Sequence, residues 1–273
     1  MPNYNIPHGE VFPLGIDCAG RPGGVAVAKR SPYSLICRYL SDGGASLPGK
    51  KLLPDEAADY LANDVAIVSN WETYANRARE GYDAGHSDAI NAWNQHKACG
   101  GPDNVVVYFS VDYDAPESDQ AGINAYFQAC VDYLGVQSVG VYGGYWVCKR
   151  VKEAFPGVHI WQTKAWSGSN EHPEANLLQR IGFVTVGGVE CDVNEIRTPG
   201  DAGAWQDVRV VPEPVVPEVV APAPDPVVPD VPAPDVPVTP VHGPVSDSQK
   251  LDYLCHAVSA LVKQAGLDLP TVD

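Results

Sequence analysis

The sequence has few positive charges, a single methionine and no long apolar run. Its 273 residues include 18 lysines and arginines against 34 aspartates and glutamates, which gives a net charge of -16. The sequence contains no basic stripe that could neutralise phosphates, so the composition argues against a nucleic-acid-binding protein. It also argues against binding to an anionic membrane or wall through charge attraction. No apolar stretch approaches the roughly 20 residues of a membrane-spanning helix, and the first thirty residues lack a secretory signal pattern. We therefore expect a soluble protein that is not exported by a standard signal.

Familiar cysteine and nucleotide-binding motifs are also missing. The seven cysteines are an odd number and contain no Cys-x-x-Cys pair, whereas disulfide frameworks and zinc sites normally show paired spacings. We expect most of them to be small buried residues of a protein in a reducing compartment. No Gly-x-Gly-x-x-Gly or phosphate loop follows a predicted strand, and no Gly-x-Ser-x-Gly elbow occurs. The sequence therefore predicts no cofactor and no serine nucleophile.

Prolines are concentrated in one segment. Of the 25 prolines, 12 fall between Pro212 and Pro244, where Val, Ala, Asp and Glu fill the gaps and neither Lys nor Arg occurs. Such a segment cannot bury a core and is typical of an extended, polyproline-like spacer. At about 3.1 Å per residue it can separate two modules by roughly 100 Å. We therefore divide the chain into a folded domain at 1–210, a linker at 211–245 and a C-terminal segment at 246–273.

The segment after the prolines has the pattern of a helix, which a merely disordered tail would not have. Ser246 and Gln249 form a capping box, and Gly266 is a stop signal. Between them, apolar residues alternate spacings of three and four at Leu251, Leu254, Val258, Leu261 and Ala265. We predict that the apolar stripe of residues 246–266 binds either a second copy of the chain or another protein.

The first 210 residues alternate short β-like runs with helical patterns. The clearest helix runs from Ser118 to Leu134, a second begins at Pro54, and a third contains Ala89 to Trp93. The expected strands are 13–17, 34–39, 65–71, 104–112, 138–142, 158–162, 177–181 and 189–193. Alternating strands and helices imply parallel pairing with right-handed crossovers. Eight strands in about 200 residues predict an α/β fold of the compact (β/α)₈ TIM-barrel type.

Polar and aromatic residues gather at the carboxyl ends of these predicted strands, where a parallel barrel places its active site. Each acid alone could equally well start a loop or cap a helix. Their convergence on one rim favours a functional role. The residues at these positions are Asp17, Trp71, Glu72, Asp112, Asp114, Tyr142, Trp161, Gln162, Asp192 and Asn194.

Asp112 and Asp114 lie two residues apart in an extended segment, so their side chains are expected to face the barrel mouth together. Two carboxyl groups held so close together cannot both ionise easily, and one of them tends to keep its proton near neutral pH. An acid and a base in one place is what cleavage of a glycosidic bond requires. Clusters of acids also bind divalent cations, so a metal-dependent hydrolase is a rival, although we assign no metal ligands.

Aromatic and amide side chains on the same rim suit a carbohydrate ligand. We expect the flat faces of Trp71, Tyr142 and Trp161 to stack on sugar rings, with Gln162 hydrogen-bonding to hydroxyl groups. Core packing is the alternative for each aromatic ring, and we prefer it for Tyr108, Phe109 and Tyr126.

These residues resemble a known family, the glycoside-hydrolase-like barrel called domain of unknown function 1906, which is related to the family 25 lysozymes. The resemblance is spread in order over about 180 residues. It is carried by Gly15-Ile-Asp17-Cys, Cys37-Arg-Tyr39-Leu, Leu53-Pro-Asp-Glu-Ala57, Tyr108-Phe-Ser-Val-Asp112-Tyr-Asp114, Gly140-Val-Tyr142-Gly-Gly, Ile160-Trp-Gln162 and Cys191-Asp192-Val-Asn194. Such domains occur in actinobacteria and their phages and are thought to act on wall glycans.

The resemblance implies a sugar cleft lined by Asp17, the acid pair after the fourth strand, and Asp192. The lysozymes carry Asp-x-Glu on that strand, with Glu as proton donor, whereas this chain has Asp114. A side chain shorter by one methylene places the donor about 1 Å farther back, which can cost roughly a hundredfold in rate. Either Asp114 donates in a reshaped cleft, or Glu72 is the acid, or the domain binds glycan without cutting it.

The sequence therefore predicts a peptidoglycan-directed glycosidase of muramidase type from an actinobacteriophage. We expect an endolysin or a virion-associated enzyme, present in the host cytoplasm before release or in the phage tail, whose C-terminal helix binds itself or a virion protein. The alternatives are a non-catalytic glycan-binding module and a structural tail component. The expected catalytic residues are Asp112, Asp114, Glu72, Asp17 and Asp192. The expected substrate-binding residues are Trp71, Tyr39, Tyr142, Trp161, Gln162 and Asn194.

Overall fold

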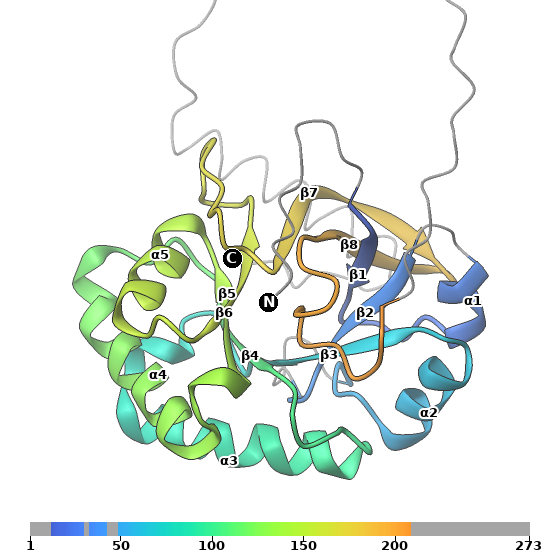
Figure 1. Cartoon of the computed structure of the whole chain (residues 1–273), viewed down its shortest axis with the longest axis horizontal. Helices are drawn as coiled ribbons and strands as arrows, with labels where there is room; N and C mark the ends of the chain where they lie inside the picture. The colour runs from blue at the N-terminus through green and yellow to red at the C-terminus, as the bar shows by residue number, and fades with distance from the viewer. Residues whose placement is uncertain (1–11, 30–32, 43–48, 209–273) are drawn as a thin grey trace, which may run out of the picture. The chain divides into compact units, whose positions relative to one another are not determined.

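Eight strands close into a barrel in chain order in the computed structural model, which describes residues 12–29, 33–42 and 49–208 (Figure 1). Each strand from β1 to β6 pairs in parallel with the next strand in the chain. The fold confirms the α/β, TIM-like barrel expected from the sequence. The strands are β1 Leu14–Asp17, β2 Tyr33–Tyr39, β3 Ala66–Trp71, β4 Val107–Val111, β5 Val139–Gly143, β6 His159–Thr163, β7 Leu177–Val186 and β8 Val189–Ile196.

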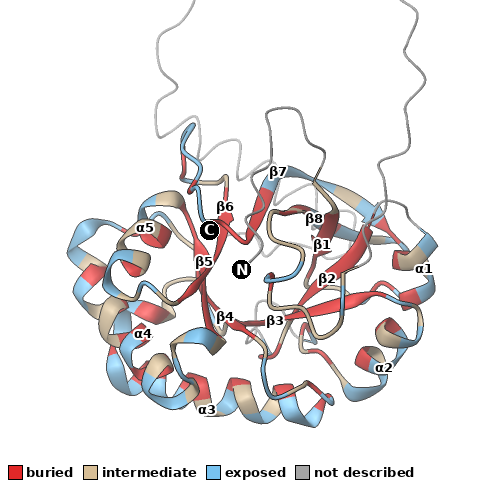
Figure 2. Cartoon of the chain, in the orientation of Figure 1, coloured by how far each residue is buried: buried red, intermediate tan, exposed pale blue. Residues whose placement is uncertain are grey.

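Strands β1 to β6 read as nearly continuous buried runs because both of their faces are covered, whereas β7 and β8 also carry exposed residues (Figure 2). Side chains alternate between the barrel interior and the helical layer, as β2 illustrates: Leu35 and Cys37 pack inside the barrel, and Ile36 packs under the helices. Three aromatic side chains, Tyr108, Tyr142 and Trp161, fill the interior together with small aliphatic residues.

Five helices of the described residues lie around the barrel (Figure 1). They are α1 Gly24–Lys29, α2 Pro54–Ala62, α3 Tyr82–Ala98, α4 Gln120–Leu134 and α5 Tyr145–Ala154. The three helices expected from the sequence are confirmed as α2, α3 and α4, whereas α1 and α5 were not anticipated. Glycines let α3 and α4 approach closely, since a Cβ at Gly85 would overlap the backbone carbonyl of Tyr126.

The prediction of all-parallel pairing is wrong for the last strand. β8 runs antiparallel to both β7 and β1 and closes the barrel between them. The sequence contains the reason at Gly187 and Gly188, whose φ angles of 57° and 83° form a two-residue hairpin turn that joins β7 directly to β8. A parallel crossover would need a dozen or more residues.

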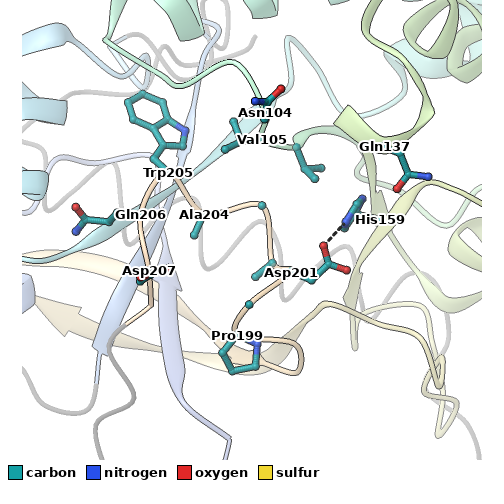
Figure 3. Close-up of a pocket in the computed structure, with 14 residues that line it drawn as sticks. Asn104, Val105, Gln137, His159, Pro199, Asp201, Ala204, Trp205, Gln206 and Asp207 are labelled. Carbon is teal, nitrogen blue, oxygen red and sulfur yellow. Dashed lines mark hydrogen bonds and ion pairs between the residues drawn. The ribbon is translucent and has the colours of Figure 1, made fainter. Parts of the chain in front are cut away.

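Residues 199–207 close the end of the barrel at which the parallel strands begin. There the backbone N–H of Trp205 donates to the carbonyl of Ile67 at 2.8 Å, and the Tyr108 hydroxyl donates to the carbonyl of Ala202 at 3.2 Å. A cavity of about 400 Å³ remains beside this segment, where Nε2 of His159 lies 2.9 Å from Oδ1 of Asp201 (Figure 3). Its lining residues lie before their strands, at the first position of β6 or after β8, so this cavity is at the end opposite the predicted acids.

The linker predicted at 211–245 and the C-terminal helix at 246–273 lie outside the described residues. Among the described cysteines, all six are buried and free of disulfide bonds, as expected. None of the helices within the described part of the chain is long and apolar enough to cross a membrane.

The close approach of α3 and α4 predicts that Gly85→Ala destabilises the fold. Alanine has the higher helix propensity by about 1 kcal/mol, so propensity alone favours the substitution. The overlap with the Tyr126 carbonyl outweighs this, and we expect a net loss of about 1–3 kcal/mol in the free energy of unfolding, measured by urea denaturation. Gly200→Ala is the matched control, because no atom would lie within 4 Å of its Cβ. Equal stabilities of the two variants would contradict this packing.

Candidate active site in the barrel mouth

Four carboxyl groups from four parts of the barrel meet at the mouth. Asp17 ends β1, and Asp192 lies directly opposite it on β8. Glu72 follows β3, and Asp112 follows β4. Besides burial, the charges of Asp192 and Asp112 raise the pKa of Asp17, and the charges of Glu72 and Asp192 raise that of Asp112, so the four carboxyl groups belong to one electrostatic cluster. Because β8 is antiparallel, Asp192 reaches the mouth from the beginning of its strand and not from the carboxyl end that the sequence suggested.

Asp17 is the most deeply placed of these acids, with 4% of its surface exposed. Its Oδ2 accepts hydrogen bonds from Nε2 of Gln179 at 2.9 Å and from Nδ2 of Asn194 at 2.7 Å. Burial, followed by the charge of Asp192, raises its pKa to about 7, although the two amide hydrogen bonds oppose the shift. Asp17 therefore exchanges a proton near neutral pH.

Two aromatic side chains orient the amides that hold Asp17. The Tyr142 hydroxyl donates to Oε1 of Gln179 at 2.8 Å, and Nε1 of Trp161 donates to Oδ1 of Asn194 at 2.7 Å. Each amide oxygen is thereby fixed as an acceptor, so each amide nitrogen faces the Asp17 carboxyl. The hydrogen bonds from Tyr142 and Trp161 thus fix the orientation of the amides, and through them the position of the Asp17 carboxyl.

Asp112 is half-buried, and its pKa is also raised to about 7. Burial is the largest cause, and the negative charge of Glu72 is the next; the Lys50 ammonium acts in the opposite direction. A carboxylic acid that still holds its proton near neutral pH can donate that proton to a leaving group.

Lys50 is a residue of the mouth that sequence reasoning missed. It is 2% exposed, its Nζ lies 3.4 Å from Oε1 of Glu72, and the same atom lies 4.0 Å from the centre of the Tyr39 ring. Tyr39 itself is placed at the mouth, as expected. The missed signal is a lysine in the loop after the second strand, which only the fold brings beside the loop after the third. Gln179, within β7, was missed in the same way.

The structure corrects six of the predicted site positions. Two of them are Tyr142 and Asn194, which we expected to bind sugar. They are 8% and 0% exposed, and they hold Asp17 in place, Asn194 directly and Tyr142 through Gln179.

Two further corrections concern Asp114 and Trp71. Asp114 is exposed, and the charge that most raises the pKa of Asp112 is that of Glu72, so the expected pairing of Asp112 with Asp114 is replaced. Trp71 packs on the helical side of β3 in the main core, facing away from the mouth. This follows from strand alternation, because Asn70 and Glu72 on either side of it face inward.

The other two corrections concern β6. Trp161 is 1% exposed inside the barrel and cannot stack on a sugar, although it orients Asn194. Gln162 is fully buried on the opposite face of the strand. Its Nε2 donates to the carbonyl of Asn170 at 2.9 Å, and its Oε1 accepts from the backbone N–H of His172 at 2.7 Å, so it holds the loop after β6.

A cavity of about 290 Å³ opens beside the acids. Asp17, Tyr39 and Asp192 line it, together with Phe183 and Glu190 of the β7–β8 hairpin. Its volume is at the lower end of those typical of small-molecule sites, which suits one small ring at a time. Within the described ranges, no three His, Cys, Asp or Glu side chains are grouped so as to hold a metal ion.

The sequence matches the family model described as an Rv2525c-like, glycoside hydrolase-like domain over residues 26–196. The candidate peptidoglycan hydrolase Rv2525c of Mycobacterium tuberculosis is 33% identical over 178 residues, which cover 62% of this chain and 73% of that protein. The uncharacterised protein FadG of Bacillus subtilis is 28% identical over 200 residues, covering 67% of this chain but only 34% of FadG.

Solved structures show the same barrel. The crystal structure of the Tat-secreted M. tuberculosis protein Rv2525c with L-tartrate matches with a TM-score of 0.66 and 28% identity, covering 72% of this chain and 100% of that one. A glycosyl hydrolase 25 of Streptococcus pneumoniae, GHIP, matches with a TM-score of 0.50 and 12% identity, covering 70% and 89% of the two chains. At that identity the second match shows a shared fold alone.

The raised pKa of Asp17 predicts a pH-dependent cost to stability. The folded protein binds this proton more tightly than the unfolded chain, so the free energy of unfolding falls as pH rises from about 4 to about 7. Asp17→Asn removes the ionisation, while its Oδ1 can accept both amide hydrogen bonds. We expect the variant to match the parent at pH 4 and to exceed it by about 2–4 kcal/mol at pH 8, measured by urea denaturation. An identical pH dependence for both proteins would contradict the assignment.

Proposed function

Because the chain belongs to the family of Rv2525c-like, glycoside hydrolase-like domains, we propose that it hydrolyses glycosidic bonds in the glycan strands of peptidoglycan. The observation that carries the proposal is the group of carboxyls in the mouth, where burial and the charge of Glu72 raise the pKa of Asp112. Glycoside hydrolysis needs a carboxylic acid and a carboxylate at one place, with their protonation states set apart by their surroundings.

Asp112 is the proton donor in this proposal. Its raised pKa lets it hold a proton at neutral pH and pass it to the glycosidic oxygen as the bond to the departing sugar breaks. A water molecule adds to the anomeric carbon and gives its proton to a carboxylate of the mouth. Glu72, paired with the Lys50 ammonium, supplies the carboxylate charge that raises the pKa of Asp112. Asp192, and Asp17 when it is ionised, lie on the β1–β8 side of the mouth, where a carboxylate stabilises positive charge that develops on the sugar ring.

The finer parts of the proposal concern where the enzyme works. We propose a phage-encoded muramidase that acts on the wall, either as an endolysin or as part of the virion tail. The peptidoglycan substrate is supported by the relative Rv2525c, which is itself a candidate peptidoglycan hydrolase. The Tat secretion of that same protein supports action outside the cytoplasm.

A glycan-binding module without catalysis is the second candidate function. The observation in its favour is the exposure of Asp114, which stands where the related lysozymes carry their proton-donating Glu. Such a module would use the same mouth to hold the sugars but would release no reducing ends.

Sugar release by an Asp112→Asn variant tests the proposed function. We expect the parent to release reducing sugars from purified mycobacterial peptidoglycan and to clear its turbidity. Asp112→Asn cannot donate a proton and should be slower by about 10²–10⁴-fold. Asp114→Asn is the comparison variant. If the exposed Asp114 is the proton donor, this variant and not Asp112→Asn should lose activity. Binding of peptidoglycan without sugar release by the parent would favour the module.

The charges around Asp112 predict opposite shifts in the pH dependence of hydrolysis. Activity requires protonated Asp112, so kcat/KM should fall as pH rises above about 7. Glu72→Gln removes a charge that raises this pKa and should move the fall to lower pH. Lys50→Met removes a charge that lowers it and should move the fall to higher pH. Profiles of kcat/KM between pH 4 and pH 9 measure both shifts, and two shifts in the same direction would contradict the assignment.

A further inference from the structure

The β7–β8 hairpin has two faces of different character. On one face, Val184, Val186 and Cys191 pack into the main hydrophobic core. The turn also fits closely against α1, since a Cβ at Gly187 would lie 3.1 Å from the Cβ of Ala26. Figure 1 shows the hairpin reaching across to α1. The hairpin is therefore held in place and does not hang free over the mouth.

The opposite face of the hairpin carries Phe183 beside the acids. Phe183 is paired directly with Asp192 across the β7–β8 ladder, and Asp192 is paired directly with Asp17 across the β8–β1 ladder. Residues directly opposite each other in antiparallel strands point to the same face of the sheet. The three side chains therefore form one row across three strands, and all three line the cavity of about 290 Å³.

An irregularity in β7 sets this alignment. Between Gln179, which pairs with Asn194, and Phe183, which pairs with Asp192, β7 advances four residues while β8 advances two. The additional residues bulge out of the ladder at Gly182, whose φ is 98°. Bulges beside active sites commonly redirect a side chain. Here the bulge brings a phenylalanine to the position opposite an acid of the mouth.

Phe183 is 64% exposed, so packing does not account for its size. Single exposed apolar residues are common, but this ring lines a cavity between two strands that carry carboxyl groups. We infer that Phe183 is a sugar-binding residue, whose ring stacks on the apolar face of a pyranose while Asp17 and Asp192 hydrogen-bond to groups at the edge of the sugar. The inference rests on the proposed function, because it takes the ligand of the mouth to be a glycan.

This role makes Phe183 a binding residue and not part of the proton-transfer step. Asp112 is not among the residues that line the cavity around Phe183. Stacking holds the ground state and the transition state equally, so its loss should raise KM and leave kcat nearly unchanged. Ile181 provides a matched control on the same strand. It is 72% exposed but does not line the cavity.

The experiment measures binding separately from cleavage. Chitotetraose, a soluble chain of four N-acetylglucosamine units, is titrated by calorimetry into Asp112→Asn proteins, which do not consume it. We expect Phe183→Ala to weaken binding by about tenfold, the effect of roughly 1.4 kcal/mol. Phe183→Tyr should bind like the Asp112→Asn protein, and Phe183→Leu should remain weak because it lacks a flat ring. Ile181→Ala should change binding by less than twofold. With Asp112 intact, Phe183→Ala should raise KM on peptidoglycan without lowering kcat.

The outcomes separate this inference from the proposed function. Glycan binding that is unaffected by Phe183→Ala overturns the inference and leaves the hydrolase proposal standing. Equal weakening by Phe183→Ala and Ile181→Ala also overturns it, because the hairpin would then act as a general apolar surface. Failure of all proteins to bind chitotetraose, combined with no sugar release from peptidoglycan by the parent, overturns the proposed function and the inference together.

Discussion

The mouth of this barrel is organised by the cost of placing several negative charges together with little water around them. Asp17 is almost fully buried within reach of the charges of Asp192 and Asp112, and Asp112 is near Glu72. Carboxylates in such a place either find compensating partners or hold their protons to higher pH. The protein uses both solutions, since Lys50 pairs with Glu72 while the pKa values of Asp17 and Asp112 rise to about 7.

The fold supports that arrangement through the antiparallel strand that completes the barrel. β8 brings Asp192 opposite Asp17 and places Asn194 where it donates to the same carboxyl. Beneath them, Tyr142 and Trp161 in the barrel interior fix the orientation of the amides that hold Asp17. Core packing and site geometry are thus carried by the same side chains, as expected where a reacting group must be held firmly. The stability lost by burying an ionisable acid is a common cost of such sites.

Much of the barrel could be predicted from the sequence, because its strands are short buried runs followed by polar residues. The positions of Asp17, Glu72 and Asp112 at the mouth follow from strand ends alone. Lys50 and Gln179 could not be found in this way, since one lies in a loop and the other within a strand, and only tertiary contacts join them to the acids. Trp71 and Trp161 show the limit of the same reasoning, because a shift of one residue along a strand exchanges the barrel interior for the helical side.

Membership of the Rv2525c-like family and the cluster of acids, two of which have pKa values raised to about 7, together support a hydrolase of wall glycans. The central claim is that acids in the mouth keep their protons to near neutral pH. The most direct measurement is a titration of the side-chain carboxyl carbons by ¹³C NMR, with Asp17→Asn and Asp112→Asn used to assign the signals. The account predicts aspartate signals that titrate near pH 7, each lost in its own variant. If every aspartate titrates below about pH 5, the account of the mouth is contradicted.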